Sequence, residues 1–368
     1  MPAFGEALNE AQIDALADYI LHRRAQGVSE EVAWKPPGPM AISQTTTASC
    51  VGCHKKQADA WRASRHAMAM GPGVIGQYGE LKNADVKRCN ECHAPALLES
   101  REQTDGVDCV SCHLTPDGLR GLNGRRHIPI PETSGEGAID PGFRRSDSCL
   151  HCHNLPLGTA VDGRPLLDTW REWAASRWLP NGTQCHGCHM PNGDHGFHGA
   201  HDPGRVRSAV KVKTLDPVER GDRVSWGFSI GNVGAGHHFP TTATPRAIVT
   251  ISQTAQGVPL ESTHSLWSIG REVEFIDGQW VQHFDTRIPS GAHFASSYEA
   301  PRRPNADGVR LELSFFPDWH YTGLFETILS RGLSVIARER IEAGYKNTRS
   351  SAFLVERVDR QLAGPNER

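Results

Sequence analysis

Every cysteine of this chain belongs to one repeated five-residue motif, Cys-x-x-Cys-His. Five copies use all ten cysteines. Two thiols separated by two residues can bond covalently to the vinyl groups of a haem, and the histidine that follows can bind the iron from the proximal side. The predicted thioether residues are Cys50, Cys53, Cys89, Cys92, Cys109, Cys112, Cys149, Cys152, Cys185 and Cys188. The predicted proximal ligands are His54, His93, His113, His153 and His189.

Other chemistry is open to a single Cys-x-x-Cys pair, which is also typical of a zinc half-site or a redox dithiol. Zinc ribbons pair two such units and do not require a histidine after each. A disulfide framework gives no reason for a histidine after every second cysteine. Because all five motifs end in histidine and no cysteine lies outside them, the sequence predicts five haems c.

The length and charge of the chain limit its class. At 368 residues it is long enough for two or three domains. The formal charge is −3 before the haem propionates are added, which argues against nucleic-acid binding. No apolar run approaches the roughly 18 residues of a membrane-spanning helix, so no transmembrane segment is predicted.

Residues 1–27 have the pattern of an amphipathic helix over 9–24. Asn9 and Gln12 form a capping box. One apolar stripe follows at helical spacing, made of Ile13, Leu16, Ala17, Ile20 and Leu21. With Met1-Pro2 before it, this stretch resembles the end of a class I monohaem cytochrome c, which implies that Met1 is an axial ligand. We expect the natural chain to continue upstream with a sixth haem and a signal peptide; the alternative is a plain helix after a true start at Met1.

The rest of the chain divides by composition. Residues 28–48 are a polar, proline-stiffened linker, and residues 49–203 form a pentahaem domain with little regular secondary structure, with one helix at Trp170–Trp178. Residues 204–368 contain short, partly alternating strands between Gly, Pro and Asp turns, typical of an antiparallel β-sandwich, followed by a helical tail. The predicted strands are Ala209–Lys213, Val224–Ile230, Ala247–Ile251 and Val309–Phe315, and the helical stretch is Leu324–Ile336. The fold class is therefore predicted as α+β.

The sixth ligand of each iron decides whether a haem carries electrons or binds a small molecule. Candidate distal histidines follow the haem motifs closely or lie in glycine-rich loops that allow close approach to a flat ring. They are His66, His127, His195, His201 and His237, with Met1 as the sulfur candidate.

Residues 49–300 resemble one group of multihaem c-type cytochromes. The group includes the tetrahaem electron carrier of hydroxylamine oxidation and, more distantly, hydroxylamine oxidoreductase and pentahaem nitrite reductase. The shared motifs are Trp61-x-x-Ser64-x-His66, His93-Ala94-Pro95, Gly106-Val107, His189-Met190-Pro191, His195-x-Phe197-x-Gly199-x-His201 and Gly236-His237-x-Phe239-Pro240-Thr241. The resemblance implies closely stacked, mostly bis-histidine haems, with His66, His195 and His237 at distal positions. The chain departs from the group at Thr242, where glycine is usual.

The sequence thus predicts a carrier that relays single electrons between a donor and an acceptor redox protein, with no catalytic residues of its own. Covalent haem attachment takes place outside the cytoplasm, so a periplasmic or otherwise extracytoplasmic location is expected, although no signal peptide is present in the sequence. The first alternative is a reductase or oxidase of a small nitrogen or sulfur oxyanion, which would act at one five-coordinate haem that His127 or His201 fails to reach. A structural binding module is the third reading.

Overall fold

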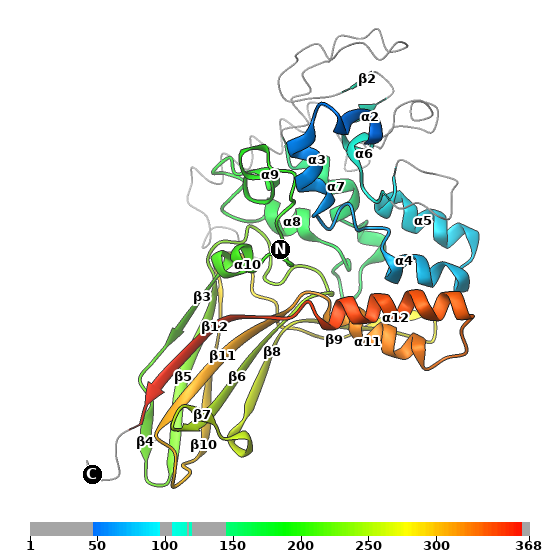
Figure 1. Cartoon of the computed structure of the whole chain (residues 1–368). Coiled ribbons are helices and arrows are strands. Elements are labelled where there is room, and N and C mark those ends of the chain that lie inside the picture. The colour runs from blue at the N-terminus through cyan, green and yellow to red at the C-terminus, as the bar shows by residue number, and fades with distance from the viewer. Residues whose placement is uncertain (1–46, 96–104, 116–117, 120–144, 363–368) are drawn as a thin grey trace. The chain divides into compact units, whose positions relative to one another are not determined.

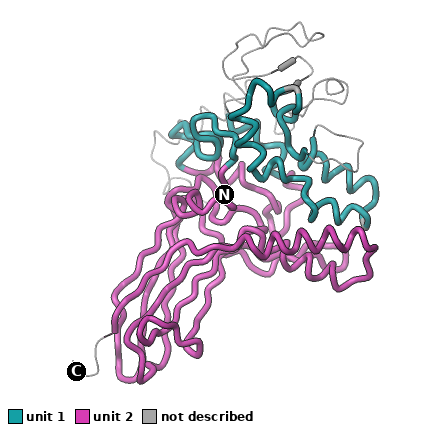
Figure 2. The backbone as a smooth tube through the Cα atoms, viewed as in Figure 1, with its two compact units in different colours: residues 1–154, 177–197 teal, residues 155–176, 198–368 magenta. Residues whose placement is uncertain are grey.

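The computed structural model describes residues 47–95, 105–115, 118–119 and 145–362, and Figure 1 shows their elements. The predicted module at 1–27, nearly all of the linker 28–48, and the candidates Met1 and His127 lie outside the described residues. The chain divides into two compact units, coloured separately in Figure 2. One comprises residues 1–154 and 177–197, and the other residues 155–176 and 198–368.

The first unit, here called the haem unit, consists of short elements. Its helices are α2 Thr47–Val51, α3 Lys55–Arg62, α4 Pro72–Gln77, η4 Tyr78–Glu80, α5 Asn83–His93, α6 Cys109–His113, α7 Asp147–His153, α9 Cys185–His189 and η7 Pro191–Gly193, and a two-stranded ladder joins β1 Leu114–Thr115 to β2 Gly118–Leu119. The apolar cluster among its described residues is small, built on the buried residues Met70, Tyr78, Val86 and Ala94. Short helices and a small apolar cluster agree with the predicted domain of little regular structure.

The second unit, here called the sandwich unit, has ten strands among its described residues. They are β3 Val210–Thr214, β4 Val218–Arg220, β5 Arg223–Asn232, β6 Arg246–Ala255, β7 Val258–Pro259, β8 Ser265–Ile276, β9 Gln279–Asp285, β10 His293–Pro301, β11 Gly308–Phe316 and β12 Phe353–Gln361. Its helices are η6 Leu157–Thr159, α8 Thr169–Ala174, α10 Pro203–Ala209, η8 Glu261–Thr263, α11 Trp319–Leu329 and α12 Val335–Arg349.

Two antiparallel sheets make up the sandwich (Figure 1). One has the order β10-β5-β3, with β4 also on β5, and the other has the order β12-β11-β6-β8-β9, with β7 also on β6. Alternate residues of β5 and β11 are buried, as expected when one face of each sheet packs on a core. Phe228 of β5 meets Trp267 of β8 at a centroid distance of 5.0 Å, which joins the two inner faces. The predicted α+β fold with a C-terminal antiparallel sandwich is confirmed.

Three predicted elements differ from the structure in their bounds. The helix expected at Trp170–Trp178 ends at Ala174. The stretch Leu324–Ile336 is divided between α11 and α12, and Ser334 caps α12 by accepting a hydrogen bond from the Ala337 amide. After α12 the chain returns as strand β12, which pairs with β11, so a strand follows the predicted helical tail. None of the described helices is both long and apolar enough to cross a membrane.

Residues 155–176 cluster with the sandwich, although the sequence-based division placed them in the haem domain. Arg271 of β8 is fully buried and holds this segment. Its guanidinium donates to the carbonyls of Pro165 at 2.5 Å, Arg164 at 2.8 Å and Val161 at 2.9 Å. The chain therefore leaves the haem unit directly after the fourth motif and returns to it just before the fifth motif.

Candidate haem-binding site

The attachment motifs lie on single turns of helix. Helices α5, α6, α7 and α9 each end at the histidine of their motif, whereas α2 covers only the start of the first motif and His54 lies at the N-terminus of α3. Positions i, i+3 and i+4 share one face of a helix. One turn therefore presents both thiols and the imidazole of a motif on the same side, as a covalently bound haem requires.

The ten thiols are not joined in disulfides. Instead, thiols of different motifs interact in pairs: Cys50 with Cys109, Cys92 with Cys152, and Cys149 with Cys185. The hydrogen bond with Cys109 lowers the pKa of Cys50 to about 7, which burial and the charge of Asp108 oppose. These contacts make the first motif a neighbour of the third, the second of the fourth, and the fourth of the fifth.

Two predicted distal histidines face predicted proximal ones. The rings of His195 and His113 have centroids 6.2 Å apart and are nearly parallel, at 20°. The rings of His66 and His153 are also 6.2 Å apart, at 43°. Metal–imidazole bonds are about 2 Å long, so two imidazoles on opposite sides of one metal have centroids roughly 6 Å apart. Both pairs therefore have the spacing that one shared iron would impose.

His66 is positioned through its backbone. Its carbonyl accepts a hydrogen bond from the Val107 amide at 2.9 Å, and the Trp61 indole donates to the Val107 carbonyl at 2.8 Å. Gly106 has a φ of +62°, and a Cβ there would lie 2.3 Å from the His66 carbonyl oxygen, so this close approach requires glycine. Burial, and then the nearby His153 and His189, lower the pKa of His66 to about 3. The neutral imidazole that results is the form that binds metal.

His195 is positioned by the turn after the fifth motif. Its Nδ1 lies 2.8 Å from the Gly193 carbonyl, which favours the tautomer with the lone pair on Nε2. His93 shows the same arrangement, with Nδ1 2.7 Å from the Ala69 carbonyl. Phe197 lies between the two pairs, 4.1 Å from the ring of His66 and 6.0 Å from that of His195. Phe197 is the aromatic position of the His195-x-Phe197 motif, for which no role of its own was predicted.

His237 belongs to the sandwich unit, in the turn after β5. The peptide between His237 and His238 is held at both polar atoms: Asn232 Nδ2 donates to its carbonyl at 2.8 Å, and its amide donates to Glu172 at 3.1 Å. The His237 Nδ1 lies 2.8 Å from the His238 carbonyl, which again favours a lone pair on Nε2. Burial lowers the pKa of His237, which keeps its ring neutral. In the same turn Thr242 has a φ of +66°, in the left-handed region that glycine adopts more readily than other residues.

Three histidines near these turns have carboxylate partners. His201 Nε2 lies 2.8 Å from Asp318 Oδ2, so this nitrogen of a predicted distal candidate is used by a carboxylate. His198 Nδ1 lies 2.7 Å from Asp202, and His238 Nδ1 lies 2.8 Å from Glu172. A carboxylate on Nδ1 is the usual support of a metal-bound histidine. His198 and His238 were not predicted as candidates. Each lies close in sequence to a histidine that was predicted as one.

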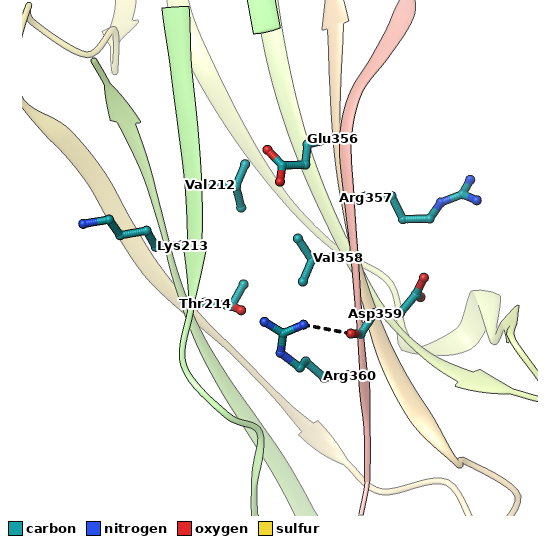
Figure 3. A pocket seen from close by; sticks show the side chains of 8 residues that line it. All are labelled: Val212, Lys213, Thr214, Glu356, Arg357, Val358, Asp359 and Arg360. Carbon is teal, nitrogen blue, oxygen red and sulfur yellow. Dashed lines mark hydrogen bonds between the residues drawn. The ribbon is translucent and has the colours of Figure 1, made fainter. Parts of the chain in front are cut away.

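A groove of about 600 Å³ lies on the sandwich, between the edge strands β3 and β12. Figure 3 shows its lining, which is largely charged and includes Lys213, Glu356 and Arg360. Neither cysteine nor histidine is among the residues that line it. This groove is therefore separate from the haem chemistry.

The residues of the haem unit fit haem c on two observations. The histidine pairs are spaced for a shared metal, as described above. In addition, Nδ1 of His66 is buried without a hydrogen-bond partner among the described residues. A buried polar atom left unpaired costs about 1–3 kcal/mol, so this ring is not placed to serve the polypeptide's own hydrogen bonding.

Comparison with known proteins agrees with this geometry. Residues 49–114, which include the first three motifs, match the family described as cytochrome c554 and c-prime. The fold resembles that of a penta-haem cytochrome c552 from Thermochromatium tepidum, with a TM-score of 0.63 and 18% identity over 88% of this chain and 100% of that chain. A Northeast Structural Genomics Consortium target overlaps 43% of this chain and 89% of its own, at 10% identity and a TM-score of 0.18, which is too low to indicate a shared fold. No curated protein matches the chain. The chain therefore has the fold of a multihaem cytochrome.

Proposed function

We propose that this protein is an extracytoplasmic multihaem c-type cytochrome that relays single electrons along five closely packed haems. The observation that supports this most directly is the pair of 6.2 Å histidine contacts beside the attachment helices. When both axial positions of an iron are taken by histidine, substrate has no site to bind, and one-electron transfer is the chemistry that the haem supplies.

The residues then have distinct roles. The ten motif cysteines form the thioether bonds and the five motif histidines bind iron from the proximal side. His66 is the sixth ligand opposite His153, and His195 is the sixth ligand opposite His113. We assign a distal role to His237 as well, because its ring is neutral, buried and fixed in its tautomer.

The contacts between motifs suggest a path for electrons between the haems. The thiol contacts place the first motif beside the third, the second beside the fourth, and the fourth beside the fifth. Cys112 of the third motif also affects the pKa of Cys149 in the fourth, which connects the first pair to the rest. Electrons can therefore pass among all five sites without leaving the haem unit. Partners would be a donor and an acceptor redox protein outside the cytoplasm.

The decisive experiment is performed on protein matured in a host that attaches haem c. We expect the intact mass to correspond to five haems and the low-temperature electron paramagnetic resonance spectrum to be low-spin. His66→Ala and His195→Ala should each introduce a high-spin signal equivalent to one haem. The matched control is His283→Ala, an exposed residue of β9, which should leave the spectrum unchanged.

Two results would reject the proposal. Protein that carries no haem would remove its chemical basis. Ligand variants with the spectrum of the wild type would reject the assigned pairs. A high-spin signal in the wild type that shifts on addition of nitrite would favour the oxyanion reductase or oxidase instead.

A further inference from the structure

Asp108 is a buried carboxylate between the first and third attachment motifs. Asp108 is 7% exposed to solvent. Oδ2 accepts a hydrogen bond from Thr47 Oγ1 at 2.8 Å, and Thr47 begins helix α2, which carries Cys50. Oδ1 accepts from the amide of Ser111 at 3.0 Å and from its hydroxyl at 2.6 Å, and Ser111 lies inside the third motif. One carboxylate thus connects both motifs.

The bonding pattern is that of an ionised carboxylate. All three bonds are donated to its oxygens, and an ionised carboxylate can only accept. The residue also precedes Cys109 directly and lies away from water, so salt and solvent screen its charge weakly. Asp108 is therefore a fixed negative charge within the haem unit.

This charge reaches the attachment thiols. Burial raises the pKa of Cys112 to about 12, and the charge of Asp108 adds to that rise. At Cys109 the same charge adds to the larger effects of the Cys50 thiol and of burial, which also raise the pKa. A charge that disfavours a negative sulfur also disfavours an added electron on the iron porphyrin bound at that sulfur.

We propose that Asp108 lowers the reduction potential of the haem attached through Cys109 and Cys112, and to a lesser degree that of the haem attached through Cys50 and Cys53. This inference rests on the proposed function. With these lower potentials, the haems of the first and third motifs pass electrons toward the haem of the fourth motif.

The test is a spectropotentiometric titration of the haem-loaded full chain. Asp108→Asn keeps the shape and removes the charge, and we expect one of the five one-electron steps to move upward and a second step to move upward by less. A tenfold change in the reduction equilibrium corresponds to 59 mV for one electron. We expect a shift of about that size, which persists at high salt because the charge is buried. The matched control is Asp59→Asn, an exposed carboxylate of α3, for which no shift is expected.

A second variant keeps the proposal testable if Asp108→Asn fails to mature. Thr47→Val removes one donor and leaves the carboxylate less compensated, so the same step should move downward. A purely structural role for Asp108 predicts no such opposite shift. Unchanged potentials in an Asp108→Asn protein with five haems would overturn this inference alone, as would an unchanged Thr47→Val protein. Missing haems in the wild type would overturn the proposed function itself.

Discussion

Glu172 has the most extensive set of charged and polar partners around the His237 turn. It accepts hydrogen bonds from Arg287 at 2.8 Å, from the Thr241 hydroxyl at 3.0 Å and from the His238 amide at 3.1 Å. Burial opposes ionisation, but the hydrogen bond and charge of His238, with the charge of Arg287, lower the pKa of Glu172 to about 2. Because the pKa is lower in the folded state, its stabilising contribution is complete above pH 4.5 and is lost as the pH falls toward 2.

We expect Glu172→Gln to flatten the acid limb of the stability profile. Between pH 4.5 and 2 this carboxylate should lower the free energy of unfolding of the wild type by about 3 kcal/mol, and the variant should lack this decrease. Urea unfolding followed by far-UV circular dichroism across this range measures the difference. Glu299→Gln is the control, because that carboxylate is 61% exposed and its pair with Arg223 contributes little. Parallel profiles for wild type and Glu172→Gln would contradict the assignment.

At the scale of single residues, sequence reasoning predicts the attachment residues because covalent chemistry fixes their spacing. It also predicts His66 and His195 as distal ligands, but not which proximal histidine each one faces. That pairing depends on chain segments far apart in sequence, such as the contact of Gly106 with the His66 carbonyl. The Asp318 partner of His201 was invisible for the same reason.

At the scale of elements, the attachment of residues 155–176 to the sandwich depends on Arg271. Its bonds to the carbonyls of Pro165 and Val161 are buried, the bond to the Arg164 carbonyl is part-buried, and Gln282 of β9 accepts a further bond from its Nε at 2.7 Å. The segment also carries Glu172, so its position determines that of the His237 turn. A residue on β8 therefore influences a predicted haem ligand through contacts within one unit.

We expect Arg271→Met to reduce the free energy of unfolding by about 3 kcal/mol or more, because two buried carbonyls and one part-buried carbonyl lose their donor. Denaturant unfolding of the haem-loaded protein measures this loss. Arg310→Met is the matched control: Arg310 also pairs on the sandwich, with Asp359, but that carboxylate is 52% exposed and the expected cost is below about 1 kcal/mol. Equal losses in the two variants would show that the carbonyl contacts are not what stabilises the segment.

Element prediction succeeded where alternation was regular and failed at the edge of the sheet. In β5 and β11 every second residue is buried, so the pattern in the sequence was clear. In β12 only Val355 is buried, and four of the other eight residues are charged. An edge strand has one paired side and few core contacts, so its sequence resembles a polar tail.

At the scale of the whole molecule, the two units differ in what fills them. The sandwich has an apolar core drawn from residues 206–362, including the fully buried Ile230, Ile251, Leu311 and Leu313. The described part of the haem unit has the small cluster around Tyr78. Burial of apolar surface is the main favourable contribution to folding. We therefore expect the haem unit, unlike the sandwich unit, to depend on bound porphyrin for its interior.

This difference predicts how the full chain behaves when it is produced without haem. Amides of β5, β6 and β11 should exchange slowly with solvent, because their strands enclose the apolar core, whereas those of α5 and α6 should exchange rapidly. Hydrogen exchange read by mass spectrometry on full-length haem-free chain measures both regions in one sample, and the haem-loaded chain is the control in which both are protected. Slow exchange of α5 and α6 without haem would show that the polypeptide alone supplies enough packing to fold the attachment motifs.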